Sequence, residues 1–267
     1  MKKYLVPTLA LVALLPFALA QAPAPVAAPA APAAAPTPPV HVDASAAIEK
    51  KDATGKFQKR HADFLARGKE GPMGVLFLGD SITEGWTKAP HIWEHYYGKM
   101  QPANFGIGGD QTQHVVWRIE NGELDGIHPK VVVLMLGTNN SGSHTADEIA
   151  AADKKIVAMI RAKIPETKVL LLAIFPRGPS KDRQTNAVTE RTIGLAAKAM
   201  ATITAANDQL AKLDDGVNIR YLDVGKKFLG DDGKIPSIIM PDQLHPTAAG
   251  YQLWAEAMQP LLVEMMK

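Results

Sequence analysis

The residues with the clearest chemical potential are a serine, an aspartate and a histidine. Ser81 follows a continuous apolar run, Val75 to Leu78, through Gly79 and Asp80. Such a run is typical of a strand buried on both faces, so we predict Ser81 where this strand ends and a helix begins. Ligands bind at that edge of an open α/β sheet, and a serine there faces the crevice. The alternative is that Asp80 or Ser81 only caps the next helix.

A base for the serine hydroxyl is predicted near the other end of the chain. Asp242 and His245 lie three residues apart in a turn that Pro246 closes into the last helix. At this spacing the carboxylate can lie beside the imidazole and fix its tautomer, which is the orienter and base of a hydrolytic triad. Taken singly, Asp242 is also an ordinary turn carboxylate and His245 an ordinary surface histidine.

Acyl transfer also requires N–H donors that face the negative oxygen of the intermediate. Two more small, polar clusters follow predicted strands, Gly106 to Asp110 and Gly137 to Asn140. We predict an oxyanion hole from the N–H groups of Ser81 and Gly109 and the side-chain amide of Asn139. A glycine at position 109 lets the backbone approach the substrate closely.

Polar side chains in the same clusters and in the following Pro-Arg-Gly segment are candidate substrate contacts. They are Asp80, Asn140 and Arg177. Their hydrogen-bonding groups suit hydroxyls and carboxylates, although loops of this composition are equally often solvated turns.

The elements that must position these residues alternate between apolar strands and helical patterns. Strands without period-two alternation, separated by helices, predict a parallel sheet covered on both faces, with its functional loops at one edge. The expected strands are 75–78, 102–105, 131–136, 169–175 and 219–222. The expected helices are two pieces within 43–67, one from Ser81 through Trp93, and 111–120, 146–162, 186–213 and the segment from Pro246.

Together, these clusters closely resemble the four blocks of the SGNH hydrolases, serine esterases whose blocks carry Ser, Gly, Asn and His. The blocks occur in the family's order, and the likeness is nearest to the platelet-activating-factor acetylhydrolase branch. They are Gly79-Asp-Ser81, Asn104 to Asp110, Gly137-Thr-Asn-Asn140 and Asp242-x-x-His245, with further likeness at Thr112-Gln-His114, Trp117 to Glu123 and Pro176-Arg-Gly178.

The resemblance covers roughly residues 73–260. It implies a three-layer α/β/α fold of the flavodoxin-like kind, with a central parallel sheet of about five strands. It also implies that the enzyme needs no metal or other cofactor, and that Ser81, Gly109 and Asn139 form the oxyanion hole. The brain-type subunits of that branch are intracellular, so their lipid-mediator substrate is not carried over to a chain expected to be exported.

The N-terminal region predicts export. Residues 1–20 combine Lys2 and Lys3 with an apolar stretch and a small-residue cleavage site, as in a signal peptide, with a retained anchor as the alternative. Residues 21–42 form an Ala/Pro-rich linker, and 43–267 the hydrolase domain. We therefore expect a periplasmic or secreted protein without an integral membrane segment after cleavage.

Composition excludes several other classes. The formal net charge of +2 falls to 0 once Lys2 and Lys3 are removed, which argues against nucleic acid as a partner. The absence of cysteine excludes thiol nucleophiles and zinc–thiolate sites. His91-x-x-Glu94-His95 matches an inverted zinc-peptidase pattern, and Gly106-Ile-Gly108 the start of a dinucleotide fingerprint, but both patterns are incomplete.

The sequence thus predicts an exported, metal-independent serine esterase. Its expected substrate is a small-molecule or glycan ester with a short acyl group, favouring acetyl on a polar alcohol such as a sugar. The alternatives are a lipolytic esterase or lysophospholipase of the same fold, and an exported glycan-binding domain that has lost its chemistry.

Overall fold

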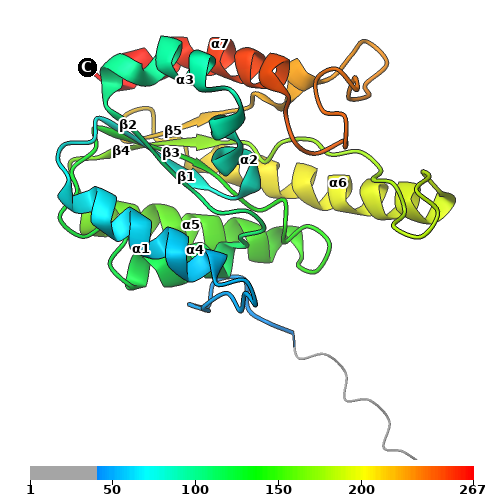
Figure 1. Cartoon of the computed structure of the whole chain (residues 1–267), viewed down its shortest axis with the longest axis horizontal. Coiled ribbons are helices and arrows are strands. Elements are labelled where there is room, and N and C mark those ends of the chain that lie inside the picture. The colour runs from blue at the N-terminus through cyan, green and yellow to red at the C-terminus, as the bar shows by residue number, and fades with distance from the viewer. Residues whose placement is uncertain (1–40) are drawn as a thin grey trace, which may run out of the picture. The chain divides into compact units, whose positions relative to one another are not determined.

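The computed structural model describes residues 41–267, which are built around one five-stranded parallel sheet (Figure 1). The strand order is β2-β1-β3-β4-β5, in which the chain begins near one edge and changes direction after β2. This is the doubly wound arrangement of flavodoxin-like proteins, and it confirms the predicted fold class. The strands are β1 Val75–Gly79, β2 Pro102–Gly106, β3 Val131–Met135, β4 Lys168–Leu172 and β5 Ile219–Leu222.

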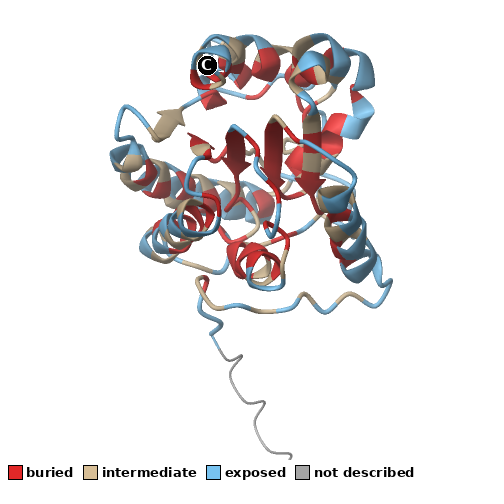
Figure 2. Ribbon diagram, turned by 90° about the vertical axis from the view of Figure 1, so that its left-hand side faces the viewer, coloured by how far each residue is buried: buried red, intermediate tan, exposed pale blue. Residues whose placement is uncertain are grey.

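Helices cover both faces of the sheet (Figures 1 and 2). Alternate residues of β1 enter two different cores: Leu76 and Leu78 pack on one side, and Val75 and Phe77 on the other. Both faces of the strand are therefore buried, which explains its unbroken apolar run. One layer contains α1 Lys56–Lys69, α4 Thr112–Glu120, α5 Ala146–Lys163 and α6 Glu190–Leu210, and the other contains α3 Pro90–Tyr97 and α7 Ala248–Met265.

An aromatic cluster joins the segment after Ser81 to α7. The ring of Trp86 lies 4.6 Å from that of Tyr251 and 4.9 Å from that of Trp254, and 5.4 Å from the ring of Tyr97 on α3. These large side chains are almost fully buried. Their packing fixes α7, and with it the turn that precedes α7, against the carboxyl end of β1.

The segment between residues 41 and 55 differs from the prediction, because it contains no helix. The Asp43 carboxylate accepts the N–H of Ser45 at 2.7 Å, and that of Asp52 accepts the N–H of Thr54 at 2.9 Å. These side-chain turns compete with helical hydrogen bonds and hold the segment as an irregular arm. The predicted helical pattern begins only at Lys56, after Gly55.

The helix expected from Ser81 through Trp93 is broken into three pieces. The short helix α2, Ser81–Glu84, continues as a 3₁₀ turn, Gly85–Lys88, and α3 starts separately at Pro90. Proline lacks an N–H and suits the first position of a new helix, so it marks this break. The other elements differ from prediction only at their ends. The predicted signal peptide and nearly all of the linker lie outside the described residues, and none of the helices within 41–267 is long and apolar enough to span a membrane.

Candidate active site

Ser81 lies at the start of α2, directly beyond the carboxyl end of β1. The Asp80 carboxylate caps this helix by accepting the Ile82 N–H at 2.9 Å. Gly79 permits Thr83 and Met135 to approach the backbone closely, since a Cβ there would lie 2.3 Å from the Thr83 hydroxyl and 2.5 Å from the Met135 carbonyl. The local sequence Gly-Asp-Ser therefore positions the Ser81 hydroxyl at the functional edge of the sheet.

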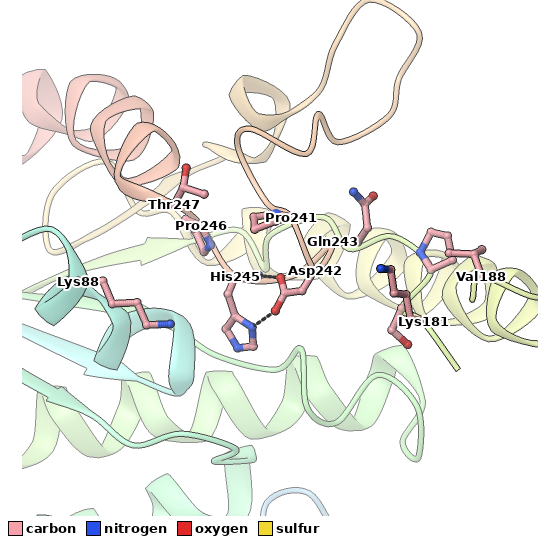
Figure 3. Close-up of a pocket in the computed structure, with 11 residues that line it drawn as sticks. Lys88, Lys181, Val188, Pro241, Asp242, Gln243, His245, Pro246 and Thr247 are labelled. Carbon is pink, nitrogen blue, oxygen red and sulfur yellow. Dashed lines mark hydrogen bonds and ion pairs between the residues drawn. The ribbon is translucent and has the colours of Figure 1, made fainter. Parts of the chain in front are cut away.

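The structure brings Ser81, His245 and Asp242 into one hydrogen-bonded chain. The Ser81 Oγ lies 2.9 Å from His245 Nε2, and His245 Nδ1 lies 2.6 Å from Asp242 Oδ2 (Figure 3 shows the second contact). Because the carboxylate accepts the Nδ1 proton, Nε2 is left with the lone pair that can take the serine proton. Gln243, between the two residues, adopts a left-handed φ of 63° that closes this tight turn.

The Asp242 carboxylate is held ionised by its own turn. Partial burial alone would raise its pKa, but hydrogen bonds from the backbone and ring of His245, the charge of that ring and the Leu244 N–H outweigh burial and lower the pKa. The Asp242 Oδ1 accepts the His245 N–H at 2.8 Å and the Leu244 N–H at 3.1 Å. A carboxylate fixed in this way can orient the imidazole and stabilise its protonated form.

Two backbone N–H groups beside Ser81 are free to donate. Within residues 41–267, neither the Ser81 N–H nor the Gly109 N–H has an acceptor in the protein. Gly109 adopts a left-handed φ of 75°, and a Cβ on its neighbour Gly108 would lie 3.8 Å from Ser81 Cβ. The loop is thus close enough for both N–H groups to serve one oxyanion.

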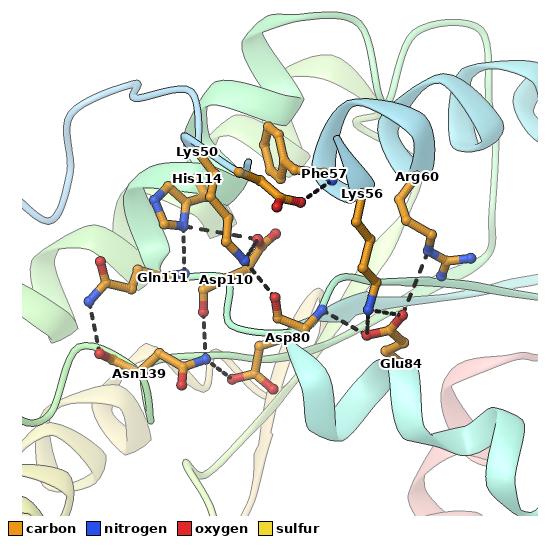
Figure 4. A network of polar contacts seen from close by, with 12 residues as sticks. Lys50, Lys56, Phe57, Arg60, Asp80, Glu84, Asp110, Gln111, His114 and Asn139 are labelled. Carbon is orange, nitrogen blue, oxygen red and sulfur yellow. Dashed lines mark hydrogen bonds and ion pairs between the residues drawn. The ribbon is translucent and has the colours of Figure 1, made fainter. Parts of the chain in front are cut away.

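The Asn139 amide lies at the same edge and is oriented by two contacts. Its Nδ2 donates to the Asp110 carbonyl at 2.9 Å and approaches Asp80 Oδ2 at 3.4 Å (Figure 4). The longer contact is weak, so the second amide hydrogen is available to an oxyanion. The structure therefore brings the five residues predicted for the triad and the oxyanion hole to one edge of the sheet.

The predicted substrate contacts Asp80 and Asn140 need correction, because both side chains are fully buried. Asn140 accepts the Thr112 N–H at 3.0 Å and supports α4 rather than facing the crevice. Burial raises the pKa of Asp80 to about 7, with the Asp110 charge adding to the shift and hydrogen bonds opposing it. Both residues act beneath the site, as structural supports.

Arg177 is half-buried beside the site rather than in the pocket next to His245. Its guanidinium donates to the Thr138 carbonyl at 3.2 Å, in the strand-end cluster that carries Asn139. Burial lowers the pKa of Arg177, and the nearby Asp80 charge opposes this shift. Arg177 therefore contacts the strand-end cluster that carries Asn139 through the backbone of Thr138.

A pocket of about 860 Å³ opens beside the His245–Asp242 pair (Figure 3). Two exposed lysines, Lys88 and Lys181, lie on opposite sides of it, and three prolines also line it. A small ester group at Ser81 could extend its alcohol or acyl portion into this space. The remaining lining residues are Pro179, Ser180, Val188, Pro241, Gln243, Pro246 and Thr247.

A buried ionic cluster supports the loop that carries Gly109, and sequence reasoning missed it. The Arg118 Nε lies 3.2 Å from Asp110 Oδ2, as an ion pair rather than an aligned hydrogen bond, and Arg118 Nη1 lies 3.0 Å from Glu123 Oε1. Burial raises the pKa of Asp110 to about 6, and Arg118 and Lys50 oppose this shift. In the sequence, Arg118 stands between the inward-facing Val116 and Ile119, and both Arg118 and Glu123 fall in the block Trp117 to Glu123, which was noted only for its likeness to the family.

The zinc-peptidase pattern lies on α3, away from this constellation. His91, Glu94 and His95 are exposed on that helix, and residues 41–267 contain no group of three histidine or acidic side chains placed to hold one metal ion. The pattern therefore has no completed ligand set in the described part of the chain.

A parallel α/β sheet with a serine, a histidine and an aspartate in hydrogen-bonded order at its carboxyl edge defines the class of serine hydrolases. Residues 77–253 match the GDSL-like lipase/acylhydrolase family, and the chain belongs to that family. This confirms the expected family and establishes the protein as a hydrolase of the GDSL type.

Curated relatives extend the likeness over most of the chain. The platelet-activating factor acetylhydrolase IB subunit alpha1 of Bos taurus is 34% identical over 221 residues, covering 82% of this chain and 88% of the relative. The alpha2 subunit of Rattus norvegicus is 32% identical, covering 83% and 90%. A GDSL-like lipase structure from Bacteroides thetaiotaomicron matches the fold with a TM-score of 0.59 at 17% identity, covering 79% of this chain and 98% of that one.

Proposed function

We propose that this protein is an exported serine esterase that hydrolyses short-acyl, chiefly acetyl, esters through an acyl-enzyme intermediate. The observation that carries the proposal is the chain from Ser81 Oγ through His245 to Asp242, at 2.9 and 2.6 Å. Two unpaired N–H groups beside the hydroxyl support it, because they supply the other half of the acyl-transfer machinery.

The proposed reaction has two steps. The Ser81 Oγ attacks the ester carbonyl while its proton passes to His245 Nε2, and the negative oxygen binds the N–H groups of Ser81 and Gly109 and the Asn139 amide. Collapse of this intermediate breaks the bond to the alcohol, which leaves with the proton from His245. Water then gives a proton to His245 and attacks the acyl-enzyme. As the bond to Ser81 Oγ breaks, His245 returns the proton to that oxygen, and the acid is released.

The acetyl preference rests on two supports. The similar curated proteins are named acetylhydrolases. In addition, Asp80, which precedes Ser81, and Thr138 and Asn140, which flank Asn139, are buried, so no channel for a long acyl chain opens at these positions. A polar alcohol such as a sugar is consistent with the hydrogen-bonding groups of Ser180, Lys88 and Lys181 in the adjacent pocket.

A lipid alcohol is the second candidate, and the apolar rim of the pocket favours it. Val188 lines the pocket and is 49% exposed, and Ile238, on the loop that carries Asp242 and His245, is 72% exposed. Exposed apolar side chains beside a site can contact an alkyl chain. The name of the curated relatives, which includes platelet-activating factor, points to the same kind of alcohol.

The deciding experiment compares wild type with Ser81→Ala on p-nitrophenyl acetate, butyrate, octanoate and palmitate. Loss of a triad nucleophile should lower kcat by several orders of magnitude without changing the melting temperature much. Ser237→Ala, at an exposed serine on the loop before α7, is the matched control. Residual Ser81→Ala activity within about tenfold of wild type would refute the nucleophile, and a steady rise in kcat/KM toward palmitate would refute the acetyl preference.

The alcohol half is then tested by acetate release. An acetylated oligosaccharide and an alkyl-acetyl glycerophospholipid, at equal concentrations, separate the two candidates. Preference for the oligosaccharide supports the polar alcohol, and preference for the phospholipid supports the lipid alcohol. Export is tested by fractionating cells that express the full chain, where retention of activity in the cytoplasm would contradict it.

A further inference from the structure

The ammonium group of Lys50 lies against the loop that carries Gly109 (Figure 4). Its Nζ is 2.5 Å from the Gly108 carbonyl oxygen and 3.4 Å from Asp110 Oδ1. A Cβ on Gly109 would lie 3.1 Å from the same Nζ, so the ammonium stands directly beside that glycine. The Lys50 side chain is only 21% exposed, so solvent screens its contact with the carbonyl less than it screens a contact on the open surface.

The carbonyl that Lys50 binds belongs to the same peptide unit as the Gly109 N–H. The described chain contains no cis peptide, and in a trans peptide the C=O and the N–H point in opposite directions within one plane. A donor that holds the Gly108 oxygen therefore also fixes the direction of the Gly109 N–H. A charged donor binds a carbonyl more strongly than a neutral one, and it polarises the amide toward a stronger N–H donor.

This peptide unit needs an external hold, because glycine flanks it on both sides. Glycine has the widest choice of backbone angles, so a Gly-Gly peptide can rotate at low cost. The preceding peptide unit is also fixed by a side chain. Glu84 Oε2 accepts the Gly108 N–H at 2.8 Å, and the same oxygen pairs with Lys56 at 2.9 Å. Lys50 thus completes a clamp, with Glu84 on the N–H side of Gly108 and the ammonium on its carbonyl side.

The arm that carries Lys50 is itself anchored to α4. The Ile48 N–H donates to the Gln113 carbonyl at 3.2 Å, and the Thr112 hydroxyl donates to the Ala44 carbonyl at 2.8 Å. Ala44 is fully buried. The irregular arm is therefore hydrogen-bonded to α4 at two points before Lys50. These bonds fix the backbone from which the Lys50 side chain reaches the loop.

We propose that Lys50 is a positioning residue for the oxyanion hole, holding the Gly108–Gly109 peptide so that the Gly109 N–H faces the oxygen formed on a Ser81 adduct. This inference rests on the proposed esterase function. Lys50 does not contact the substrate. Lys50 acts through the Gly109 N–H, which stabilises the negative charge that develops on the ester carbonyl oxygen in the transition state. Removing the ammonium should therefore lower kcat and leave KM nearly unchanged.

The kinetic test uses three variants of the full chain on p-nitrophenyl acetate. Lys50→Met keeps the aliphatic stem and removes the ammonium, Lys50→Arg restores a cationic donor, and Lys51→Met is the matched control at an exposed neighbour. Loss of a whole oxyanion donor costs about a hundredfold or more in kcat, so misdirecting one by Lys50→Met should cost about tenfold. KM should stay within about threefold, Lys50→Arg should recover most of kcat, and Lys51→Met should match wild type.

A second measurement does not depend on any substrate. In protein labelled with ¹⁵N-glycine, the Gly109 amide resonance should shift in Lys50→Met, return toward its wild-type position in Lys50→Arg and stay unchanged in Lys51→Met. The shift is expected because the ¹⁵N nucleus of an amide responds to hydrogen bonding at its own peptide carbonyl. The Gly109 signal is identified by its loss in Gly109→Ala.

The outcomes separate the inference from the proposed function. If Ser81→Ala hydrolyses the ester as fast as wild type, the proposed function is overturned. The Gly109 resonance needs no substrate, so it tests the role of Lys50 even in that case. A Lys50→Met enzyme with kcat within about twofold of wild type, or with an unmoved Gly109 resonance, would overturn the inference. Equal losses of kcat and melting temperature in Lys50→Met and Lys50→Arg would also overturn it, because they indicate a purely structural role.

Discussion

The phenolic hydroxyl of Tyr251 donates a hydrogen bond of 2.7 Å to the main-chain carbonyl of Ile82, 169 residues earlier in the chain. Ile82 directly follows Ser81, and Tyr251 lies on the first turn of α7, soon after His245. Gly85 makes room for this contact, since a Cβ there would lie 2.1 Å from the hydroxyl. The bond therefore ties the helix behind the histidine to the helix that carries the serine.

We expect Tyr251→Phe to weaken both stability and catalysis. It leaves the Ile82 carbonyl buried without its partner, which should cost about 1–3 kcal/mol of unfolding free energy. It also loosens the Ser81–His245 alignment, so kcat should fall several-fold. Urea unfolding and kcat on p-nitrophenyl acetate measure the two effects. Tyr96→Phe is the control, because it removes a hydroxyl that Gln252 contacts at 2.8 Å on the outer part of the same interface. Equal kcat losses in both variants would argue against this specific tie.

Asn139→Ala should lower kcat by about a hundredfold or more if the amide donates to the oxyanion, with a much smaller change in KM. The variant also loses the 2.9 Å bond to the Asp110 carbonyl, so its melting temperature must be measured in parallel. Asn140→Ala is the contrast, since that amide is fully buried and bonded to Thr112. It should affect stability first. An Asn139→Ala defect confined to KM would make Asn139 a substrate-binding residue instead.

Asp242→Asn should reduce kcat strongly while substrate binding persists. An amide at this position can hold the imidazole in the wrong tautomer, with the proton on Nε2, which then cannot accept from Ser81. The pKa of Asp242 is lowered, so the wild-type carboxylate is ionised at neutral pH and the comparison with the neutral amide is made there. Steady-state kinetics on p-nitrophenyl acetate measures kcat and KM, and an Asp242→Asn enzyme with the kcat of wild type would exclude Asp242 as the residue that orients His245.

Asp80→Asn should flatten the pH dependence of stability on the acid side of neutrality. The pKa of Asp80 is raised from 3.8 to about 7, chiefly by burial. Between these values the folded state binds a proton that the unfolded state has lost, so this group makes the free energy of unfolding fall as pH rises from about 4 to 7. An asparagine does not titrate, so the slope should become shallower by up to about 1.4 kcal/mol per pH unit. Urea unfolding at several pH values measures the slope, and an unchanged slope would contradict the prediction.

The positions of the strands along the chain and the place of the candidate site could be predicted because both depend on local patterns. An apolar run without alternation predicts a strand buried on both faces, and parallel strands bring their carboxyl ends to one edge. That rule alone predicted that Ser81, Gly109 and Asn139 would lie together. The 41–55 arm was predicted wrongly as helix, because side-chain turns at Asp43 and Asp52 override the weak helical spacing.

The sequence by itself determined the parallel sheet, the Gly-Asp-Ser turn and the Asp242–His245 pairing, since each rests on residues close together in the chain. Only the tertiary structure decided which polar residues face the crevice. Asp80 and Asn140 turned out to be buried beneath it, and the supports Arg118 and Lys50 reach the Gly109 loop from other elements. Burial and charge pairing depend on contacts between distant segments. Spacing along the chain does not specify which of those segments will cover a given side chain after they pack.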